Sequence, residues 1–130
     1  MLASAGSALA LAERGRALVV SSDAGETFRR VAGSANTTAI AGALLAGRAR
    51  FFAAVYRETS DQSDLLLIDP ERGEAECIAH LDAGEHSPSD AIDRGEWAKV
   101  SCLSWHAPSE RLWAAGGFGV LSFGLGTPAA

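Results

Sequence analysis

Residues 17–31 read ALVVSSDAGETFRRV and carry the most informative local pattern of the chain. An apolar, β-branched run enters a Ser-x-Asp-x-Gly turn and leaves through a second run after Thr27, a pattern typical of two strands joined by a tight loop. Gly25 permits a positive φ in the turn, and the carboxylate of Asp23 can accept hydrogen bonds from the loop's own amides. The stretch therefore predicts a β-hairpin that is held by its turn residues.

The same order of short apolar runs and turns recurs downstream. Residues 65–81 pass through a turn that contains Pro70 and Gly73, and residues 100–115 pass through a further turn. Short strands at such spacing predict an all-β antiparallel meander. The expected strands span residues 7–13, 16–22, 27–32, 38–45, 50–57, 64–69, 74–81, 99–105, 111–116 and 118–123.

These strands fall into three groups within a single domain that spans residues 1–130. The middle group, residues 38–81, is a complete four-stranded meander of the size of one propeller blade. The flanking groups, residues 7–32 and 99–123, have three strands each. The chain is therefore expected to form antiparallel, blade-like sheets.

Residues 38–56 also allow a different interpretation. Several apolar side chains fall at helical spacing and the alanines favour a helix, so an α+β fold with a helix across this segment is an alternative. Against it, Gly42 and Gly47 each cost about 1 kcal/mol relative to alanine inside a helix. The aromatic and β-branched run at 51–56 suits a strand buried on both faces. We therefore expect strand–turn–strand, with the turn at Gly47 and Arg48.

Composition excludes some classes of function. The chain has 130 residues with 11 basic and 16 acidic side chains, a formal net charge of −5, which argues against a basic nucleic-acid-binding surface. The apolar stretch at residues 8–12 is short and follows no basic residue, so no export signal is expected. Cytoplasmic residence is the default expectation, and a fragment of an exported protein is the alternative. Cys77 and Cys102 are too few for a disulfide framework and are predicted to be buried thiols.

The turn residues Ser21, Asp23, Gly25, Thr27 and Phe28 match every position of the pattern Ser/Thr-x-Asp-x-Gly-x-Thr/Ser-Trp/Phe. The chain thereby resembles the Asp-box (BNR-type) β-propellers, a family that includes sialidases, sortilin-like receptor domains and photosystem assembly factors. In that family the motif holds the hairpin between the third and fourth strands of a blade, away from the ligand face. The resemblance therefore implies a partial β-propeller in which these five residues are structural.

The resemblance also fixes an expected register. If the box ends the third strand of a blade, residues 7–13 form the second strand, and the innermost strand of that blade is absent. Residues 99–123 supply only three strands of the last blade. An arc of about two and a half to three blades cannot close a ring, since propellers typically need about four to eight.

The expected function follows from this open arc. Unclosed blade faces and strand edges should pair with another protein chain or with a second copy, because water satisfies them poorly. We therefore expect a non-catalytic scaffold or protein-interaction module, with no cofactor and without nucleic acid or a membrane as partner.

Two polar loops, residues 57–64 and 82–97, are the expected interaction surface, and in blade register both lie on the face where propellers usually bind ligands. Acidic and hydroxyl-bearing loops are usually solvated, and we predict no metal site, although His80 and His86 are weak candidates for a transition metal. Trp97 is a possible anchor, because aromatic residues often carry binding energy. The candidate contacts are Arg57, Glu58, Asp61, Asp64, Glu85, His86, Asp90, Asp93 and Trp97.

The alternative function is a part of a sialidase-like or glycan-binding propeller. Tyr56 and Glu58 lie two residues apart at a strand end, so that both side chains should leave the same face. Sialidase-like enzymes use a tyrosine nucleophile that is activated by a glutamate. Arg57 points to the opposite face, however, and no arginine triad can be placed, so no catalytic residue is assigned.

Overall fold

The computed structural model describes residues 1–13, 15–82 and 96–125, and within these ranges the chain is all-β, as predicted. The described ranges contain no helix, so the alternative of a helix across residues 38–56 is wrong, and nothing in them offers a helical membrane crossing. The strands are β1 (Leu2–Ala5), β2 (Ala8–Leu11), β3 (Val19–Ser21), β4 (Arg29–Arg30), β5 (Thr37–Leu45), β6 (Arg48–Arg57), β7 (Gln62–Asp69), β8 (Glu74–Asp82), β9 (Val100–His106), β10 (Arg111–Gly116) and β11 (Gly119–Gly124).

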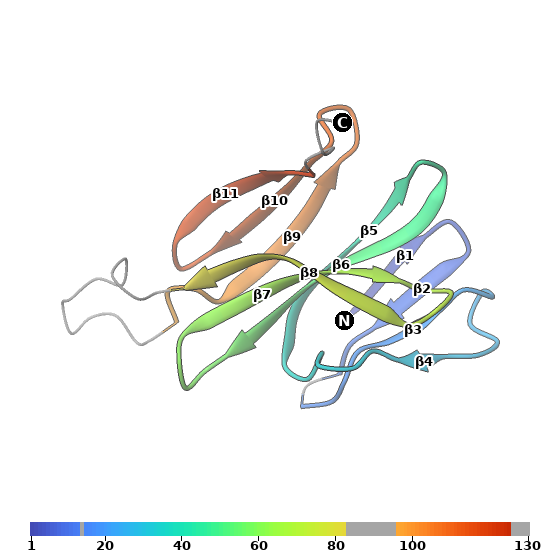
Figure 1. The fold of residues 1–130 in the computed structure, drawn as a ribbon, viewed down its shortest axis with the longest axis horizontal. Coiled ribbons are helices and arrows are strands. Elements are labelled where there is room, and N and C mark those ends of the chain that lie inside the picture. The colour runs from blue at the N-terminus through green and yellow to red at the C-terminus, as the bar shows by residue number, and fades with distance from the viewer. Residues whose placement is uncertain (14, 83–95, 126–130) are drawn as a thin grey trace.

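The strands form three antiparallel sheets, and in each sheet they follow one another in chain order (Figure 1). The first sheet holds β1–β4, the middle sheet β5–β8 and the third sheet β9–β11. The first strands of neighbouring sheets lie against each other, β1 against β5 and β5 against β9. The described chain is therefore an open, propeller-like arc of meander blades, which confirms the predicted fold class.

The middle sheet packs against both of its neighbours, and β6 shows this most clearly. Phe51 and Val55 belong to the core shared with the first sheet, whereas Phe52 and Ala54 belong to the core shared with the third sheet. Because successive residues of a strand point to opposite faces, an unbroken apolar run fits a strand that is covered on both sides. The prediction that residues 51–56 form such a strand is confirmed.

The turn between β5 and β6 lies one residue earlier than predicted, at Ala46 and Gly47. Both residues have positive φ values, 51° and 77°. A two-residue hairpin turn needs this backbone conformation because its twist matches the twist of the flanking strands. Tertiary packing of an apolar strand on both faces outweighs the helix preference of the alanines.

The prediction that the innermost strand of the first blade is absent is wrong, because β1 occupies that position. It pairs with β2 in the register Leu2 to Leu11, through a turn at Gly6 with a φ of 58°. Its sequence of leucine, alanine and serine contains no β-branched or aromatic residue, so it gives little strand signal. The first blade therefore begins at Leu2, has four strands and ends with the short β4.

Both cysteines are exposed, so the prediction of buried thiols is wrong. Cys77 lies on β8, the last strand of the middle sheet, beside an irregularity in its pairing with β7. Cys102 pairs across from Ala115 on the side of the third sheet that faces away from the middle sheet. A cysteine in a strand is buried only where another sheet covers its face, and the local sequence does not determine which face that is.

Candidate functional site

The turn between β3 and β4 contains the residues of the Ser-x-Asp-x-Gly-x-Thr-Phe pattern, and their side chains form hydrogen bonds within the turn, as predicted. The Ser21 hydroxyl donates to Asp23 Oδ1 at 2.7 Å and accepts from the Gly25 amide at 2.9 Å. The Asp23 carboxylate accepts from the amide and the hydroxyl of Thr27, at 2.9 and 2.6 Å. Gly25 has a φ of 92°. The hairpin is therefore closed by its own side chains, between the third and fourth strands of a blade.

These hydrogen bonds also set the charge state of Asp23. The Thr27 hydroxyl, the Thr27 amide and the Ser21 hydroxyl all donate to its carboxylate, and they lower the pKa of Asp23 to about 2. Both carboxylate oxygens accept donors from within the turn. Asp23 therefore stabilises the hairpin, and the turn leaves it little capacity for an external ligand.

Phe28, the aromatic residue of the pattern, lies on the outside of the first blade. It directly precedes β4, in which Arg29 pairs with the buried Val20 and Arg30 pairs with Val19. Alternation along the strand places Phe28 on the same side as Arg30, away from the middle sheet. The phenyl ring is 46% exposed. It therefore adds apolar surface to the outside of the first blade.

The structure joins the two predicted loops at Asp61. Its carboxylate accepts hydrogen bonds from the backbone amides of Trp97 and Ala98, at 3.1 and 3.0 Å, and from the Tyr56 hydroxyl at 2.9 Å. Asp61 has a φ of 48°. This carboxylate ties the β6–β7 turn to the segment that leads into β9. Its contacts within the protein make Asp61 a link between the middle and third blades.

A second charged group lies on the neighbouring strands. Asp64 accepts from the Arg57 guanidinium and contacts His80 Nδ1, both at 2.6 Å. Glu58 lies in the turn after β6 and lines a hollow of about 800 Å³ together with Thr37 and Lys99. The hollow opens where the chain enters β5 and β9. The structure thus brings Arg57, Asp64 and His80 together, while Glu58 faces a separate space.

Tyr56 is held as a neutral phenol. Its side chain is buried and its hydroxyl donates to Asp61, so desolvation first, and then that hydrogen bond, raise its pKa well above the ordinary value. A phenol with a raised pKa is a weak nucleophile near neutral pH. The geometry therefore gives Tyr56 a role in packing and in positioning Asp61.

The raised pKa of Tyr56 predicts an alkaline limit to stability. A group whose pKa is higher in the folded state contributes stability below its unfolded pKa of about 10 and loses that stability as the pH rises toward the folded value. Because Tyr56 is the single tyrosine, tyrosinate absorbance reports this residue alone. We expect it to ionise together with the loss of near-ultraviolet circular dichroism. Ionisation near pH 10 in a chain that stays folded would contradict the buried hydrogen bond.

Several predicted contacts, namely Glu85, His86, Asp90 and Asp93, lie outside the described residues. Trp97 is half-buried, with its ring edge-to-face against Phe118 at a centroid distance of 5.8 Å. Within the described ranges, no cluster of three or more histidine, cysteine, aspartate or glutamate side chains has the arrangement of a metal site.

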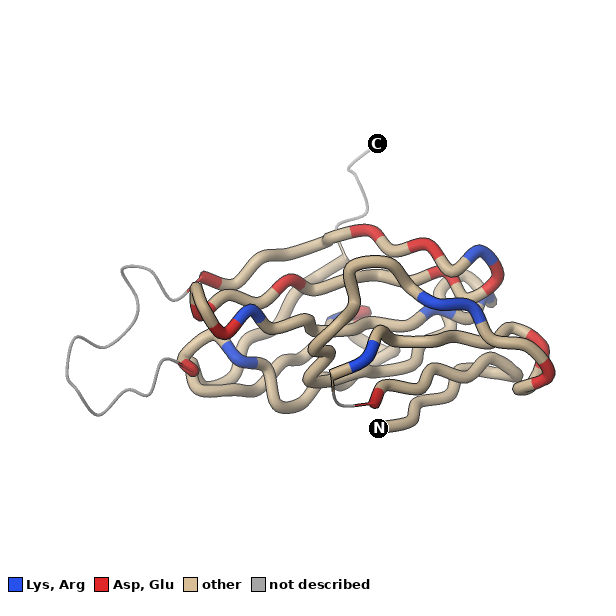
Figure 2. Tube along the Cα trace, turned by 90° about the horizontal axis from the view of Figure 1, so that it is seen from below, with Lys and Arg blue, Asp and Glu red and all other residues tan. Residues whose placement is uncertain are grey.

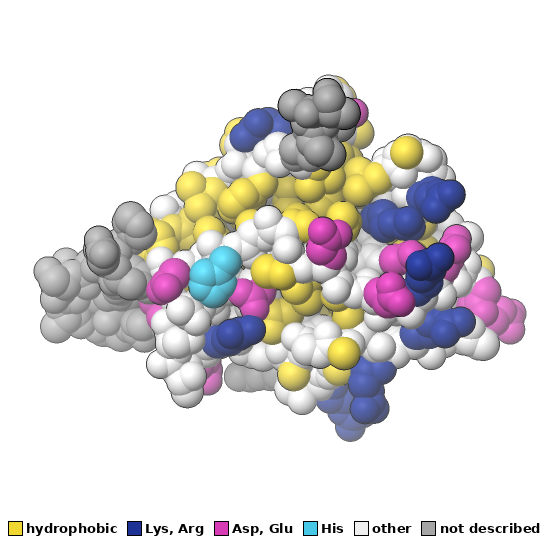
Figure 3. Space-filling view, viewed as in Figure 1, with side chains coloured by type: hydrophobic (Ala, Val, Ile, Leu, Met, Phe, Trp, Pro, Cys, Tyr) yellow, Lys and Arg dark blue, Asp and Glu magenta, His cyan; other side chains and the backbone are white. Residues whose placement is uncertain are grey.

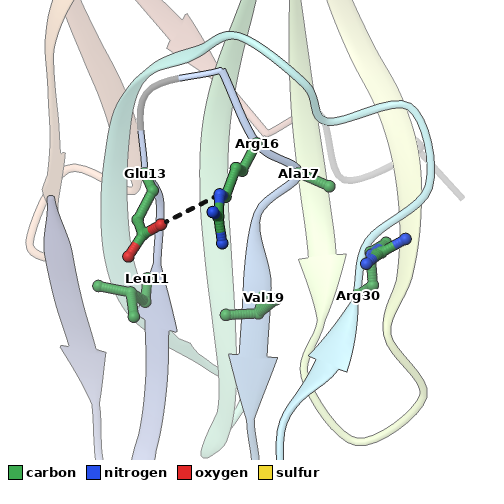
Figure 4. Close-up of a pocket in the computed structure, with 6 residues that line it drawn as sticks. All are labelled: Leu11, Glu13, Arg16, Ala17, Val19 and Arg30. Atoms are coloured by element: carbon green, nitrogen blue, oxygen red, sulfur yellow. Dashed lines mark ion pairs between the residues drawn. The ribbon is translucent and has the colours of Figure 1, made fainter.

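The outer face of the first sheet lacks a neighbouring sheet in the described chain. Ala10 and Val20 point into the core, so Leu11 and Val19 lie on the opposite side, together with Leu2, which is 67% exposed. An open hollow of about 530 Å³ lies on this side, where Arg16 pairs with Glu13 at 3.5 Å (Figure 4). Its lining residues are Leu11, Glu13, Arg16, Ala17, Val19 and Arg30.

The outer face of the third sheet is similarly open. Leu112 and Ala114 point into the core with the middle sheet, so Trp113 and Ala115 lie on the outside. Trp113 is 42% exposed, and Val120, which pairs with Ala115, is 65% exposed. The two ends of the arc therefore both present apolar side chains, although they are separated by the whole middle blade.

Charged residues of both signs are interspersed along the described strands and turns, as Figure 2 shows. Ion pairs of this kind include Arg50 with Asp69, at 3.7 Å, and Lys99 with Glu96, also at 3.7 Å. Mixed charge of this kind suits solvation and leaves the apolar end faces as the distinct features of the surface.

The sequence patterns did not predict the exposure of Leu2, Trp113 and Val120. A usable signal was present, because residues 112–115 of β10 are all apolar. Apolar residues at consecutive strand positions are typical of a strand that is covered on both faces. In the described structure β10 is covered on one face only, so the remaining face is a candidate contact surface.

Comparison of the chain with family models, with curated proteins and with solved structures finds no match.

Proposed function

We propose that this protein is a non-catalytic interaction module of the Asp-box propeller type, an arc of blades whose two end faces are covered by a second copy of the chain. The observation that carries the proposal is the pair of uncovered apolar faces, marked by Leu2 and Phe28 at one end and by Trp113 and Val120 at the other. Large exposed apolar patches commonly mark contact sites.

The internal packing supports this assembly. The middle sheet receives the first sheet on one face and the third sheet on the other, so blades of this chain already pack face to face twice. The outer face of the third sheet and the outer face of the first sheet are the two surfaces left over from that stacking. A contact between them is heterologous, and such contacts close a ring when the rotation per subunit allows it.

The experiment is mass determination by light scattering across micromolar concentrations. We expect the native chain to exceed its monomer mass of 13.4 kDa. Trp113→Lys places a charge in the contact and should return the chain to a monomer. Ala107→Lys adds the same charge in the exposed β9–β10 turn and should leave the assembly intact. A native chain that stays monomeric throughout would contradict the proposal.

A further inference from the structure

Within residues 1–13, 15–82 and 96–125, the third sheet has three strands, whereas each of the other two sheets has four. In the first and middle sheets, β4 and β8 occupy the position beyond the third strand, whereas the third sheet ends at β11. β9 corresponds to β5, since both are first strands and lie against each other. The missing strand is therefore the fourth, on the far side of β11 from β10.

The edge of β11 carries backbone groups suited to another strand. Gly116 and Gly119 form the closing pair of the two-residue β10–β11 turn. Hydrogen-bonded pairs alternate along an antiparallel ladder, and a two-residue turn is closed by a bonded pair, so residues 120, 122 and 124 direct their backbone groups away from β10. The Arg111 guanidinium covers part of this edge by donating to the Ser122 carbonyl at 3.3 Å.

A groove with apolar and polar walls lies beside this edge, and Glu76, His80 and Asp82 contribute its charged or titratable side chains. Two hollows, of about 430 and 370 Å³, separate β8 from β11. Hydrophobic atoms gather in a band across the corresponding part of the surface, along the β10–β11 hairpin and toward β8 (Figure 3). The apolar lining residues are Leu67, Ile78, Ala79, Leu81, Trp97, Leu121, Phe123 and Leu125.

The groove continues the core between the middle and third sheets. Leu81 and Phe123 pack against that core and are only partly buried, and Leu121 is 37% exposed. A strand added beside β11 would face β8 across this groove, because the third sheet packs on the middle sheet. Its side chains on that face would complete a core that already exists, and the burial of their apolar surface would favour binding.

We propose that an extended segment of a partner polypeptide adds to β11 as the fourth strand of the third sheet. Apolar and polar residues alternate along this segment, so that every second residue of the segment directs its side chain into the groove. On that same face, one basic side chain lies opposite Glu76, which lines the groove beside Ile78. This mode of recognition uses main-chain hydrogen bonds for affinity and side-chain pockets for specificity. The proposal rests on the proposed role as an interaction module and names the kind of partner that one part of the module accepts.

The test uses a fluorescein-labelled heptapeptide of sequence TVTVTKT, whose two valines and one lysine lie on the same face of the strand. We expect saturable binding to the native chain by fluorescence anisotropy. Hydrogen exchange should show new protection of the amides of residues 120, 122 and 124. Leu121→Lys should weaken binding about tenfold or more, because that side chain faces the groove. Ala107→Lys adds the same charge in the exposed β9–β10 turn and should leave binding within about twofold.

A change in the peptide provides a readout that does not depend on the folding of a variant chain. Methylation of the two central peptide nitrogens removes ladder donors on both edges of the peptide, and we expect it to abolish binding. The absence of saturable binding up to about 1 mM would overturn the proposal, as would equal weakening by Ala107→Lys. Protection of the same amides by concentrated protein alone would also overturn it, because a second copy would then occupy the edge.

The two proposals can fail separately. Trp113 lies on the outer face of the third sheet, whereas Leu121 faces the groove. A chain that stays monomeric in light scattering and still binds the peptide overturns only the assembly of end faces. A chain that assembles and does not bind the peptide overturns only the added strand.

Discussion

Replacing Phe52 with alanine is expected to lower the free energy of unfolding by about 3–5 kcal/mol. Phe52 is fully buried and its ring stacks on Trp105 at a centroid distance of 5.4 Å. This pair joins β6 of the middle sheet to β9 of the third sheet, so the substitution leaves a cavity in the core that holds these blades together. Since domains of this size are stable by only about 5–15 kcal/mol, the loss is a large share of the total.

Urea denaturation followed by tryptophan fluorescence measures this loss, because Trp105 is one of the three tryptophans and lies in the contact. Leu44→Ala is the control, since it truncates a large apolar side chain at a position that is 58% exposed. We expect that control to change the free energy of unfolding by less than about 1 kcal/mol. A loss of similar size in the two variants would show that the third sheet does not pack on β6.

Gly42→Ala is expected to lower the free energy of unfolding by about 3 kcal/mol, the upper part of the range for overpacked cores. A Cβ atom at this position would lie 2.1 Å from the carbonyl oxygen of Ser4 and 2.8 Å from its carbonyl carbon. These are backbone atoms of β1, so no side-chain rotation can relieve the overlap. The two first strands, β1 and β5, must separate, and that separation opens the core between the first and middle sheets.

Thermal and urea denaturation measure the effect, and hydrogen exchange should show that the amides of β1 and β2 lose the most protection. Gly124→Ala is the control, because a Cβ atom there would approach only the end of the Arg111 side chain, at 3.4 Å. The control should be neutral or slightly stabilising, since alanine restricts the unfolded chain more than glycine does. Equal stability of Gly42→Ala and the native chain would mean that β1 does not lie against β5.

Much of the fold was predictable because its signals are local. Asp23 and Thr27 lie in one turn, and their hydrogen bonds need no distant partner. The run at residues 51–56 also predicts its own burial, because apolar residues at consecutive positions are typical of a strand with two covered faces. β1 escaped prediction for the opposite reason, since its alanines and serine carry no strand preference and its pairing with β2 supplies the structure.

The candidate site was less predictable, because it depends on contacts between distant residues. Asp61 lies in a polar stretch that is typical of a solvated loop, and only the fold brings its carboxylate to the amides of Trp97 and Ala98. The exposure of Cys102 and Trp113 likewise depends on the absence of a fourth sheet beyond the third within the described chain. Sequence patterns indicate that a face is apolar, whereas the arrangement of the sheets determines whether it is covered.

Most of the hairpins, the all-β class and the four strands of the middle blade follow from the local sequence, since turn chemistry and the two-residue period of strands act over a few residues. Contacts between sheets place β1 as the first strand of the first blade. Among the described residues, they also leave the third blade with three strands and leave apolar side chains open at both ends of the arc. Burial of a strand face depends on which sheet packs against it, and the alternation of side chains within one sheet does not specify that neighbour.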